Sequence, residues 1–254
     1  MRIAALIALA AGLAGFASFA QARDAGAEAP AKTTAPKAVV ELYTSQGCSS
    51  CPAADALLAK LAEQKDIVAI SLSVDYWDYL GWKDTLANVK FTERQKAYAK
   101  ILGNGMVYTP QVVVNGAIEV NGANEDKIVT AIQKAAASRS LSDVPVRLSF
   151  IGGKLIVEVG AAPAGSPEKE ATVWLAVMSP KVDVPITRGE NRGKTVTYTN
   201  VVRELIPLGT WNGDLMTVKL HRDAILPAGT EMCAVLVQDG RGGPIIGAAL
   251  VDSL

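Results

Sequence analysis

The feature that most constrains the fold is an apolar run, residues 39–43, followed by a Cys-x-x-Cys motif formed by Cys48 and Cys51. The pattern then turns amphipathic, so we interpret the stretch as a strand, a tight turn and a helix start. Unpaired N–H groups and the positive end of the helix dipole favour a thiolate at such a position. Cys48 is therefore the predicted nucleophile, and Cys51 is placed to resolve a mixed disulfide. Pro52 fits the first turn of the helix.

The N-terminal sequence has the features of an export signal. Arg2 provides a basic start, residues 3–20 are apolar and small, and Ala20-Gln21-Ala22 forms an A-x-A cleavage site. Residues 1–22 are therefore predicted to be a signal peptide, and the protein to be periplasmic or secreted in a bacterium. The alternative is an uncleaved anchor, because the run approaches the spanning minimum of roughly 17 residues. With cleavage, no membrane span is expected.

The charge balance and the cysteine content indicate which classes of function fit this chain. The chain has 25 basic and 25 acidic residues, and signal removal takes only Arg2, which leaves 24 against 25. With basic and acidic residues in balance, the chain has no excess of positive charge that would indicate binding to nucleic acid or anionic lipid. Of the three cysteines, Cys233 stands apart from the motif. A bridge between Cys48 and Cys51 closes too short a loop to staple a fold, which favours redox chemistry. No cofactor and no metal are predicted.

The first half alternates strands and helices. Strands are expected at 38–45 and 67–74, helices at 49–64, 88–102 and 125–137, and a hairpin around Asn115-Gly116. Asn124 is the expected N-cap of the last helix. The first two strands should be parallel and end at the same sheet edge, which is where open α/β folds bind ligands. This places Asp75, Tyr76 and Trp77 near Cys48.

This order, with the Cys-x-x-Cys after the first strand and Thr109-Pro110 before the hairpin, resembles the thioredoxin fold over residues 38–138. Residues 43–51 look most like the strand and turn of glutaredoxins, and Pro110 matches the cis-proline position of the superfamily. The resemblance implies that the chain beside Pro110 faces the disulfide and pairs with an extended substrate.

The predicted substrate-binding residues are therefore Tyr108, Thr109, Pro110, Asp75, Tyr76 and Trp77. An alternative interpretation is that Trp77 and Trp82 only pack against the helix that follows them.

Two positions depart from the thioredoxin pattern. Gly47 stands where thioredoxins carry a tryptophan, and Leu42 stands where they carry a buried acid. Glu41 lies one residue away and should point to the opposite face of the strand. A proton acceptor beneath the disulfide is therefore not established, and the direction of electron flow stays open. Together with residues 74–82 and 108–111, the chain is similar to an uncharacterised family of exported bacterial and plant proteins, catalogued as domain of unknown function 1223.

The second half of the chain is predicted to consist of β-strands. The predicted organisation is a disordered leader at 23–37, the α/β domain at 38–138, a linker at 139–143 and a last domain at 144–254. This last domain is predicted to be an antiparallel β-sandwich of about eight short strands. The predicted fold class is a thioredoxin-like α/β domain followed by this all-β domain. His221 is expected at a surface strand end, and Cys233 in an apolar strand. A redox or metal partnership of Cys233 with Cys48 is the alternative. A charged loop, residues 188–194, is expected to be solvated, with contact to the other domain or to a partner as the alternatives.

Three hypotheses about function are compatible with these features. The first is an exported thiol-disulfide oxidoreductase that uses Cys48 and Cys51 on protein or small-molecule thiols, with a redox partner protein as a second partner. The second is a binding module that holds Cu(I) between the two thiolates. The third is an interaction protein whose β domain binds a partner and whose Cys-x-x-Cys is a static bridge.

Overall fold

The computed structural model of this protein describes residues 35–103, 105–138, 141, 143–165, 170–226, 230–240 and 242–251. The predicted signal peptide and residues 23–34 of the predicted leader lie outside the described residues, as do residues 139, 140 and 142 of the predicted linker. Within the described ranges, no helix is long and apolar enough to cross a membrane.

The first half has the predicted succession of elements. They are β1 (Ala38–Thr44), α1 (Cys51–Ala62), β2 (Ile67–Ser73), the short 3-10 helix η1 (Asp78–Leu80), α2 (Val89–Ile101), β3 (Gln111–Val114), β4 (Ile118–Asn121) and α3 (Glu125–Ser138). β1 and β2 are parallel, as predicted, with Thr44 opposite Ser73 at their ends. β3 lies antiparallel to the other edge of β1.

Local signals in this half are confirmed. The Asn124 side chain accepts a hydrogen bond from the Lys127 N–H, as an N-cap does. Asn115 and Gly116 both have positive φ, 49° and 63°, in the turn between β3 and β4. The Thr109–Pro110 peptide bond is cis.

The second half also forms strands. They are β5 (Val146–Ile151), β6 (Lys154–Val159), β7 (Ala171–Pro185), β8 (Thr195–Trp211), β9 (Met216–His221), β10 (Met232–Asp239) and β11 (Ile245–Val251), with a one-turn helix α4 (Arg222–Ile225) after β9. β7 is a long strand of 15 residues, because the segment around Pro180 continues the strand instead of turning. Pro180 lies opposite Asn200, a residue with φ of 48°, between the pairs Ser179–Val201 and Lys181–Thr199.

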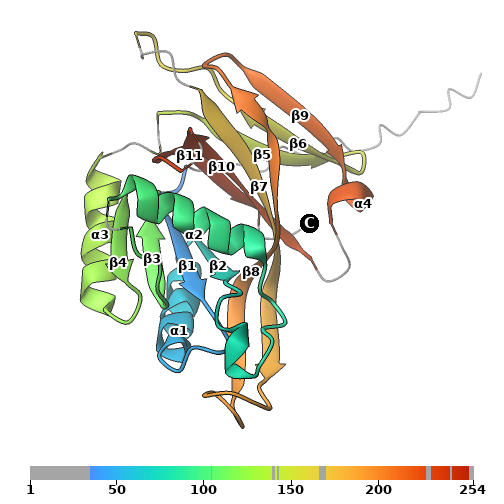
Figure 1. The fold of residues 1–254 in the computed structure, drawn as a ribbon. Helices are drawn as coiled ribbons and strands as arrows, with labels where there is room; N and C mark the ends of the chain where they lie inside the picture. Colours follow the sequence, from blue (N-terminus) through green and yellow to red (C-terminus); the bar gives the residue numbers. More distant parts are fainter. Residues whose placement is uncertain are drawn as a thin grey trace, which may run out of the picture.

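The predicted fold class is wrong. The chain does not form a thioredoxin-like α/β domain followed by an all-β sandwich, since strands from both halves share one mixed sheet of eight strands (Figure 1). Its order is β11-β10-β7-β8-β2-β1-β3-β4, and a separate sheet has the order β5-β6-β9. The described part is therefore mostly β, with only four α-helices.

The joining of the two halves has a local cause at β2. All seven residues of β2 are buried, so its second edge needs a partner for its backbone groups. β8 supplies this partner: Val201 pairs with Ser71, and the Asn200 amide donates to the Ala69 carbonyl at 2.9 Å. Sequence periodicity identifies β2 as a buried strand but does not say which distant strand covers its edge.

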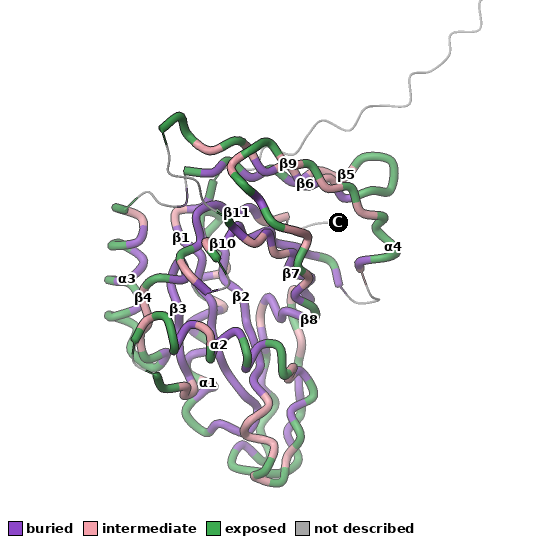
Figure 2. The backbone as a smooth tube through the Cα atoms, turned by 45° about the horizontal axis from the view of Figure 1, so that its top comes forward, coloured by how far each residue is buried: buried purple, intermediate pink, exposed green. Residues whose placement is uncertain are grey.

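The helices and the small sheet cover the two faces of the large sheet. α1 and α3 pack on one face of β1, while α2 packs on the other face through Phe91 and Tyr98. The three-stranded sheet packs against β7, β10 and β11. Figure 2 shows β1, β2 and β3 buried, whereas β4 and the ends of β7 and β8 next to the loop between them carry intermediate and exposed residues. β1, whose carboxyl end leads into the Cys-x-x-Cys, is therefore an interior strand of the eight-stranded sheet, between β2 and β3.

Candidate functional site

The two motif cysteines form a disulfide at the junction of β1 and α1, with their Cα atoms 5.4 Å apart. Cys51 is the first residue of α1 and Pro52 follows in the first turn. The Cys51 N–H donates to the Cys48 carbonyl at 3.2 Å, so Cys48 sits in the turn just before the helix. The Ser50 hydroxyl lies 3.4 Å from the Cys48 sulfur. The predicted strand, turn and helix are thus observed, with the helix beginning at Cys51.

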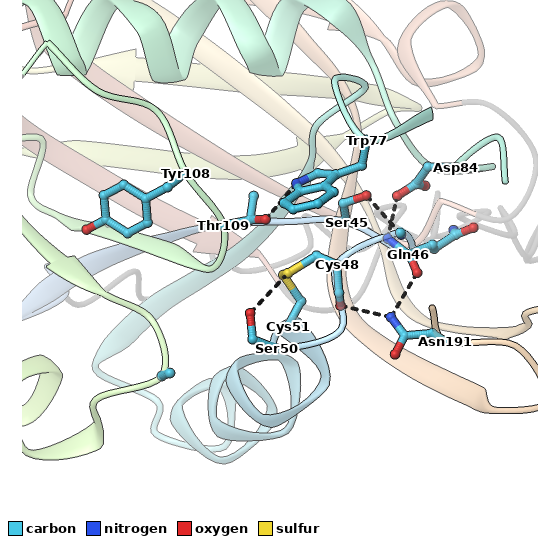
Figure 3. Close-up of a disulfide and its surroundings, with 12 residues drawn as sticks. Ser45, Gln46, Cys48, Ser50, Cys51, Trp77, Asp84, Tyr108, Thr109 and Asn191 are labelled. Atoms are coloured by element: carbon cyan, nitrogen blue, oxygen red, sulfur yellow. Dashed lines mark hydrogen bonds between the residues drawn. A yellow bond between two sulfur atoms is a disulfide. The ribbon is translucent and has the colours of Figure 1, made fainter. Parts of the chain in front are cut away.

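Both cysteines are covered in this state, since Cys48 is 1% exposed and Cys51 is 0% exposed. The cover comes from segments far apart in the sequence: the Trp77 loop after β2, Thr109 before β3, and the loop between β7 and β8 that carries Asn191 (Figure 3). The Cys48 sulfur is therefore not accessible to a substrate in this state.

Asn191 fastens the β7–β8 loop to the disulfide turn. Its side-chain amide donates to the Gln46 carbonyl at 2.9 Å and to the Cys48 carbonyl at 2.8 Å. Its own oxygen accepts from the Lys194 ammonium at 2.9 Å. The charged loop 188–194 therefore contacts the first half of the chain, one of the alternatives predicted for it. It does so through the buried side chain of Asn191.

Trp77 lies over the turn from the other side. Its indole N–H donates to the Thr109 hydroxyl at 2.8 Å, which joins two of the predicted substrate-binding residues (Figure 3). A Cβ on Gly47 would lie 3.0 Å from the Trp77 Cβ. Gly47 is therefore needed for the close approach of Trp77, and an indole from a different loop occupies the space beside this position.

Gln46 and Asp84 hold the turn on its third side. The Asp84 carboxylate accepts from the Gln46 N–H and from the Leu86 N–H, both at 2.8 Å. Burial raises the pKa of Asp84, and these two N–H bonds partly oppose the rise. The Gln46 side chain in turn accepts from the Trp82 indole at 2.8 Å. Trp82 therefore contacts the disulfide turn and packs against residues of β7 and β8, and not simply against the helix that follows it.

The other predicted substrate-binding residues flank this pair, in the loop after β2 and in the segment before β3. The Tyr108 hydroxyl donates to Glu119, and the Tyr108 ring points away from the disulfide in Figure 3. Asp75 accepts a hydrogen bond from the Thr92 hydroxyl at 2.6 Å. Burial raises the pKa of Tyr76 to about 12. Pro110 precedes β3, whose residue Gln111 pairs with Tyr43 of β1. Of this set, Trp77 and Thr109 are brought together beside the disulfide.

Sequence reasoning gave no role to Gln46; it expected the loop 79–84 to border the thiols but did not single out Asp84 in it, nor Asn191 in the loop 188–194. The only local signal for Gln46 was that it is a polar residue two positions before Cys48. Asp84 and Asn191 reach the turn from segments 36 and 143 residues beyond Cys48, so periodicity carries no signal for them. Each is recognised by its burial and its bonds to backbone atoms.

The remaining singled-out residues lie outside this site. His221 is exposed at the end of β9. Cys233 is a free cysteine in β10, 0% exposed among the apolar residues between the two sheets, and burial raises its pKa to about 12. It therefore packs as a small apolar residue. In the described part of the chain, no three His, Cys, Asp or Glu side chains form a group that could hold a metal.

Comparison with known proteins places these features in a family. A family model described as "Protein of unknown function (DUF1223)" matches residues 39–238. The crystal structure of protein AGR_C_4864 from Agrobacterium tumefaciens is similar, with a TM-score of 0.74 and 37% identity over 86% of this chain and 95% of that chain. HBP35 of Porphyromonas gingivalis shares the fold at a TM-score of 0.54 and 15% identity, over 86% of this chain and 76% of that one. No curated protein matches the chain.

Proposed function

Because this chain belongs to the family of proteins of unknown function DUF1223, we propose a function from the geometry of its own site: an exported thiol-disulfide oxidoreductase acting through Cys48 and Cys51. Export is proposed from the signal-like residues 1–22. Protein thiols and small-molecule thiols are both proposed substrates, and a relationship to the thioredoxin superfamily is part of the proposal.

The observation that carries the proposal is the disulfide at the start of α1. A bridge across three residues restricts the unfolded chain by only about 2 kcal/mol in a chain-entropy estimate, so stapling explains it poorly. The N-terminus of α1 instead offers its dipole and N–H groups to a sulfur that becomes charged during exchange. The segment Thr109-Pro110 beside the turn supports a substrate-binding role for its backbone.

The exchange itself balances in two steps. The Cys48 thiolate attacks one sulfur of a substrate disulfide, and the other substrate sulfur leaves as a thiolate. The Cys51 thiolate then attacks the Cys48 sulfur, closes the Cys48–Cys51 disulfide and releases the second substrate thiolate. The substrate disulfide has been reduced and the cysteine pair oxidised; the opposite direction runs the same steps in reverse.

The test is equilibration of the native protein with reduced and oxidised glutathione. We expect a measurable reduction potential, and a value near about −120 mV or near about −270 mV would separate an oxidase from a reductase. A Cys51→Ser variant should accumulate a mixed disulfide at Cys48, whereas Cys233→Ala, the control, should behave as the unaltered protein. A pair that exchanges only after denaturation contradicts the proposal.

A second function is favoured by one observation, the burial of both sulfurs. A static bridge in a protein-interaction module would be covered in this way. The same titration distinguishes the two functions, because a static bridge resists glutathione in the folded protein.

A further inference from the structure

A cavity of about 850 Å³ lies between α2 and the strands β7 and β8. Ligand pockets in proteins typically measure roughly 300–1,000 Å³, so the cavity has the size of a small-molecule site. None of its lining residues belongs to the disulfide turn, so the proposed exchange does not account for it. Its lining includes Lys90, Glu93 and Arg94 of α2, Trp174 of β7, and Leu205 and Pro207 of β8.

An irregularity in β8 shapes the floor of this cavity. In the pairing with β7, Val173 lies opposite Gly209 but Trp174 lies opposite Pro207, so Leu208 is an extra residue in β8. Pro207, Leu208 and Gly209 all line the cavity. Bulges of this kind bend a strand and are frequent beside binding sites. The floor is therefore a bent strand, and α2 forms the opposite wall.

The indole of Trp174 brings an unpaired donor to the cavity lining. Its N–H is buried and has no hydrogen-bond partner among the residues that the structure describes. Buried indole N–H groups usually find a partner, and leaving one unpaired costs stability. Phenylalanine would pack in the same place without this penalty, so the N–H itself indicates an acceptor in the cavity.

Arg94 offers a second donor next to this indole. Its guanidinium carbon lies 5.7 Å from the centroid of the Trp174 ring. A guanidinium has five N–H groups. In the described part of the chain, four of them donate: two to Glu41, one to Tyr98 and one to Gln238. The fifth, on Nη1, is left for a ligand, and the other four bonds fix the side chain that carries it.

The charges around the cavity cancel. Arg94 forms an ion pair with Glu41, and the two exposed side chains of α2 in the lining, Lys90 and Glu93, have opposite charges. A carboxylate placed here would bring a charge that the lining does not balance, whereas a carbonyl oxygen can accept two hydrogen bonds and adds no charge. Leu205 adds apolar surface. The lining therefore favours a neutral molecule with an apolar body.

We propose that this cavity is a binding site for a neutral, largely apolar small molecule that carries a carbonyl oxygen. The oxygen accepts hydrogen bonds from the Trp174 indole and from the remaining N–H of Arg94. The apolar body lies against Leu205 and Pro207. The inference depends on the cavity lining alone and does not rest on the proposed redox function.

The first experiment titrates the oxidised, unaltered protein with prodan, a neutral naphthalene dye that carries one ketone. We expect saturable binding of one dye per chain, with emission shifted to the blue as the dye leaves water. Acetylnaphthalene should displace the dye at a roughly tenfold lower concentration than ethylnaphthalene, which has a similar shape but no acceptor, or naphthoate, which is charged. Absence of saturable binding overturns the proposal, and so does equal displacement by the three compounds.

Trp174→Phe retains an aromatic ring and removes the indole N–H. Prodan should bind roughly tenfold more weakly, and acetylnaphthalene should lose most of its advantage over ethylnaphthalene. The matched control is Trp211→Phe, the same change on β8, where the indole donates to the Gly160 carbonyl and the ring packs toward the small sheet. This control should bind prodan as the unaltered protein does. Unchanged binding in Trp174→Phe contradicts the proposal.

Lys90→Gln separates a neutral ligand from an anionic one. Binding of prodan and acetylnaphthalene should not change, because neither molecule carries a charge for Lys90 to attract. If naphthoate binds more tightly than acetylnaphthalene, and Lys90→Gln removes the difference, the cavity is an anion site and the proposal is wrong.

A further measurement does not depend on any variant folding. The chain has four tryptophans, so the indole N–H signal of Trp174 can be assigned and followed by NMR in the unaltered protein. Acetylnaphthalene should move this signal downfield, as formation of a hydrogen bond does, whereas ethylnaphthalene should not. A Trp174 indole signal that does not respond to acetylnaphthalene overturns the inference.

Discussion

Asn191 bridges to Cys48 across 143 residues of sequence, donating a 2.8 Å hydrogen bond to the carbonyl of the first cysteine in the motif. The same amide binds the Gln46 carbonyl, so one side chain from the β7–β8 loop holds the disulfide turn in its covered state. Access to the sulfurs is therefore linked to a loop from the second half of the chain.

Asn191→Ala should uncover the disulfide. The loop loses both bonds to the turn, and we expect glutathione to open the disulfide several-fold faster in the folded protein. The free energy of unfolding should fall by about 1–3 kcal/mol, because buried carbonyl groups lose a donor. Arg192→Ala, on an exposed side chain of the same loop, is the control and should change neither quantity. An unchanged opening rate in Asn191→Ala would show that the loop does not limit access.

Gly47→Ala should displace Trp77. The new methyl group would meet the Trp77 Cβ at 3.0 Å, an atom tied closely to the backbone, so the indole must shift. Its hydrogen bond to Thr109 should weaken, at a cost of about 1 kcal/mol in unfolding free energy. Hydrogen exchange of the Trp77 indole N–H, followed by NMR, measures the effect. Ser49→Ala, on the exposed face of the same turn, should leave that exchange rate as it is.

Arg94→Met should be strongly destabilising. Arg94 of α2 forms a buried ion pair with Glu41 of β1, with N···O distances of 2.7 and 3.0 Å, and also donates to Gln238 of β10. Removing the cation leaves the buried Glu41 carboxylate without its counter-ion, which typically costs about 3–5 kcal/mol. Urea unfolding provides the measurement.

The control for this variant is Lys37→Met, which removes the exposed ion pair with Asp66. Exposed pairs contribute at most about 1 kcal/mol, so this change should be small. Comparable losses in the two variants would contradict a special role for the buried pair.

Asp55→Asn should change how stability depends on pH. Burial raises the pKa of Asp55 to about 8 in the folded protein, from an ordinary value of 3.8. Between these values the folded state holds one more proton than the unfolded state, so the contribution of Asp55 is present at acid pH and is lost as pH rises to about 8. The unfolding free energy of Asp55→Asn relative to the unaltered protein should therefore increase by about 1.4 kcal/mol per pH unit between pH 5 and pH 8.

Urea unfolding at four pH values in this range, with the disulfide intact, checks this expectation. Glu63→Gln should show no such slope, since its carboxyl is exposed at the end of α1. A pH-independent difference for Asp55→Asn would mean that the carboxyl is already ionised in the folded protein.

Sequence alone was sufficient for features that depend on neighbouring residues. The disulfide turn between β1 and α1, the Asn124 cap and the Asn115-Gly116 turn were all predicted, because dipoles, caps and turns act over a few residues. The orientation of Glu41, opposite to that of Leu42, also follows from strand alternation, and the two side chains do lie in different environments. The buried partner Arg94 could not be inferred, because its helix is amphipathic and a cation on it would ordinarily face solvent.

The tertiary structure alone decided how the two halves combine and what surrounds the disulfide. Strand pairing depends on which backbone edge is left uncovered after the first elements pack, and here β8 pairs with β7 along one edge and with β2 along the other. That pairing is also what brings Asn191 to Cys48 and Tyr198 toward Asp55. Periodicity in the sequence indicates which faces of an element are buried, but the segments that cover the disulfide turn are decided by pairing between strands far apart in the chain.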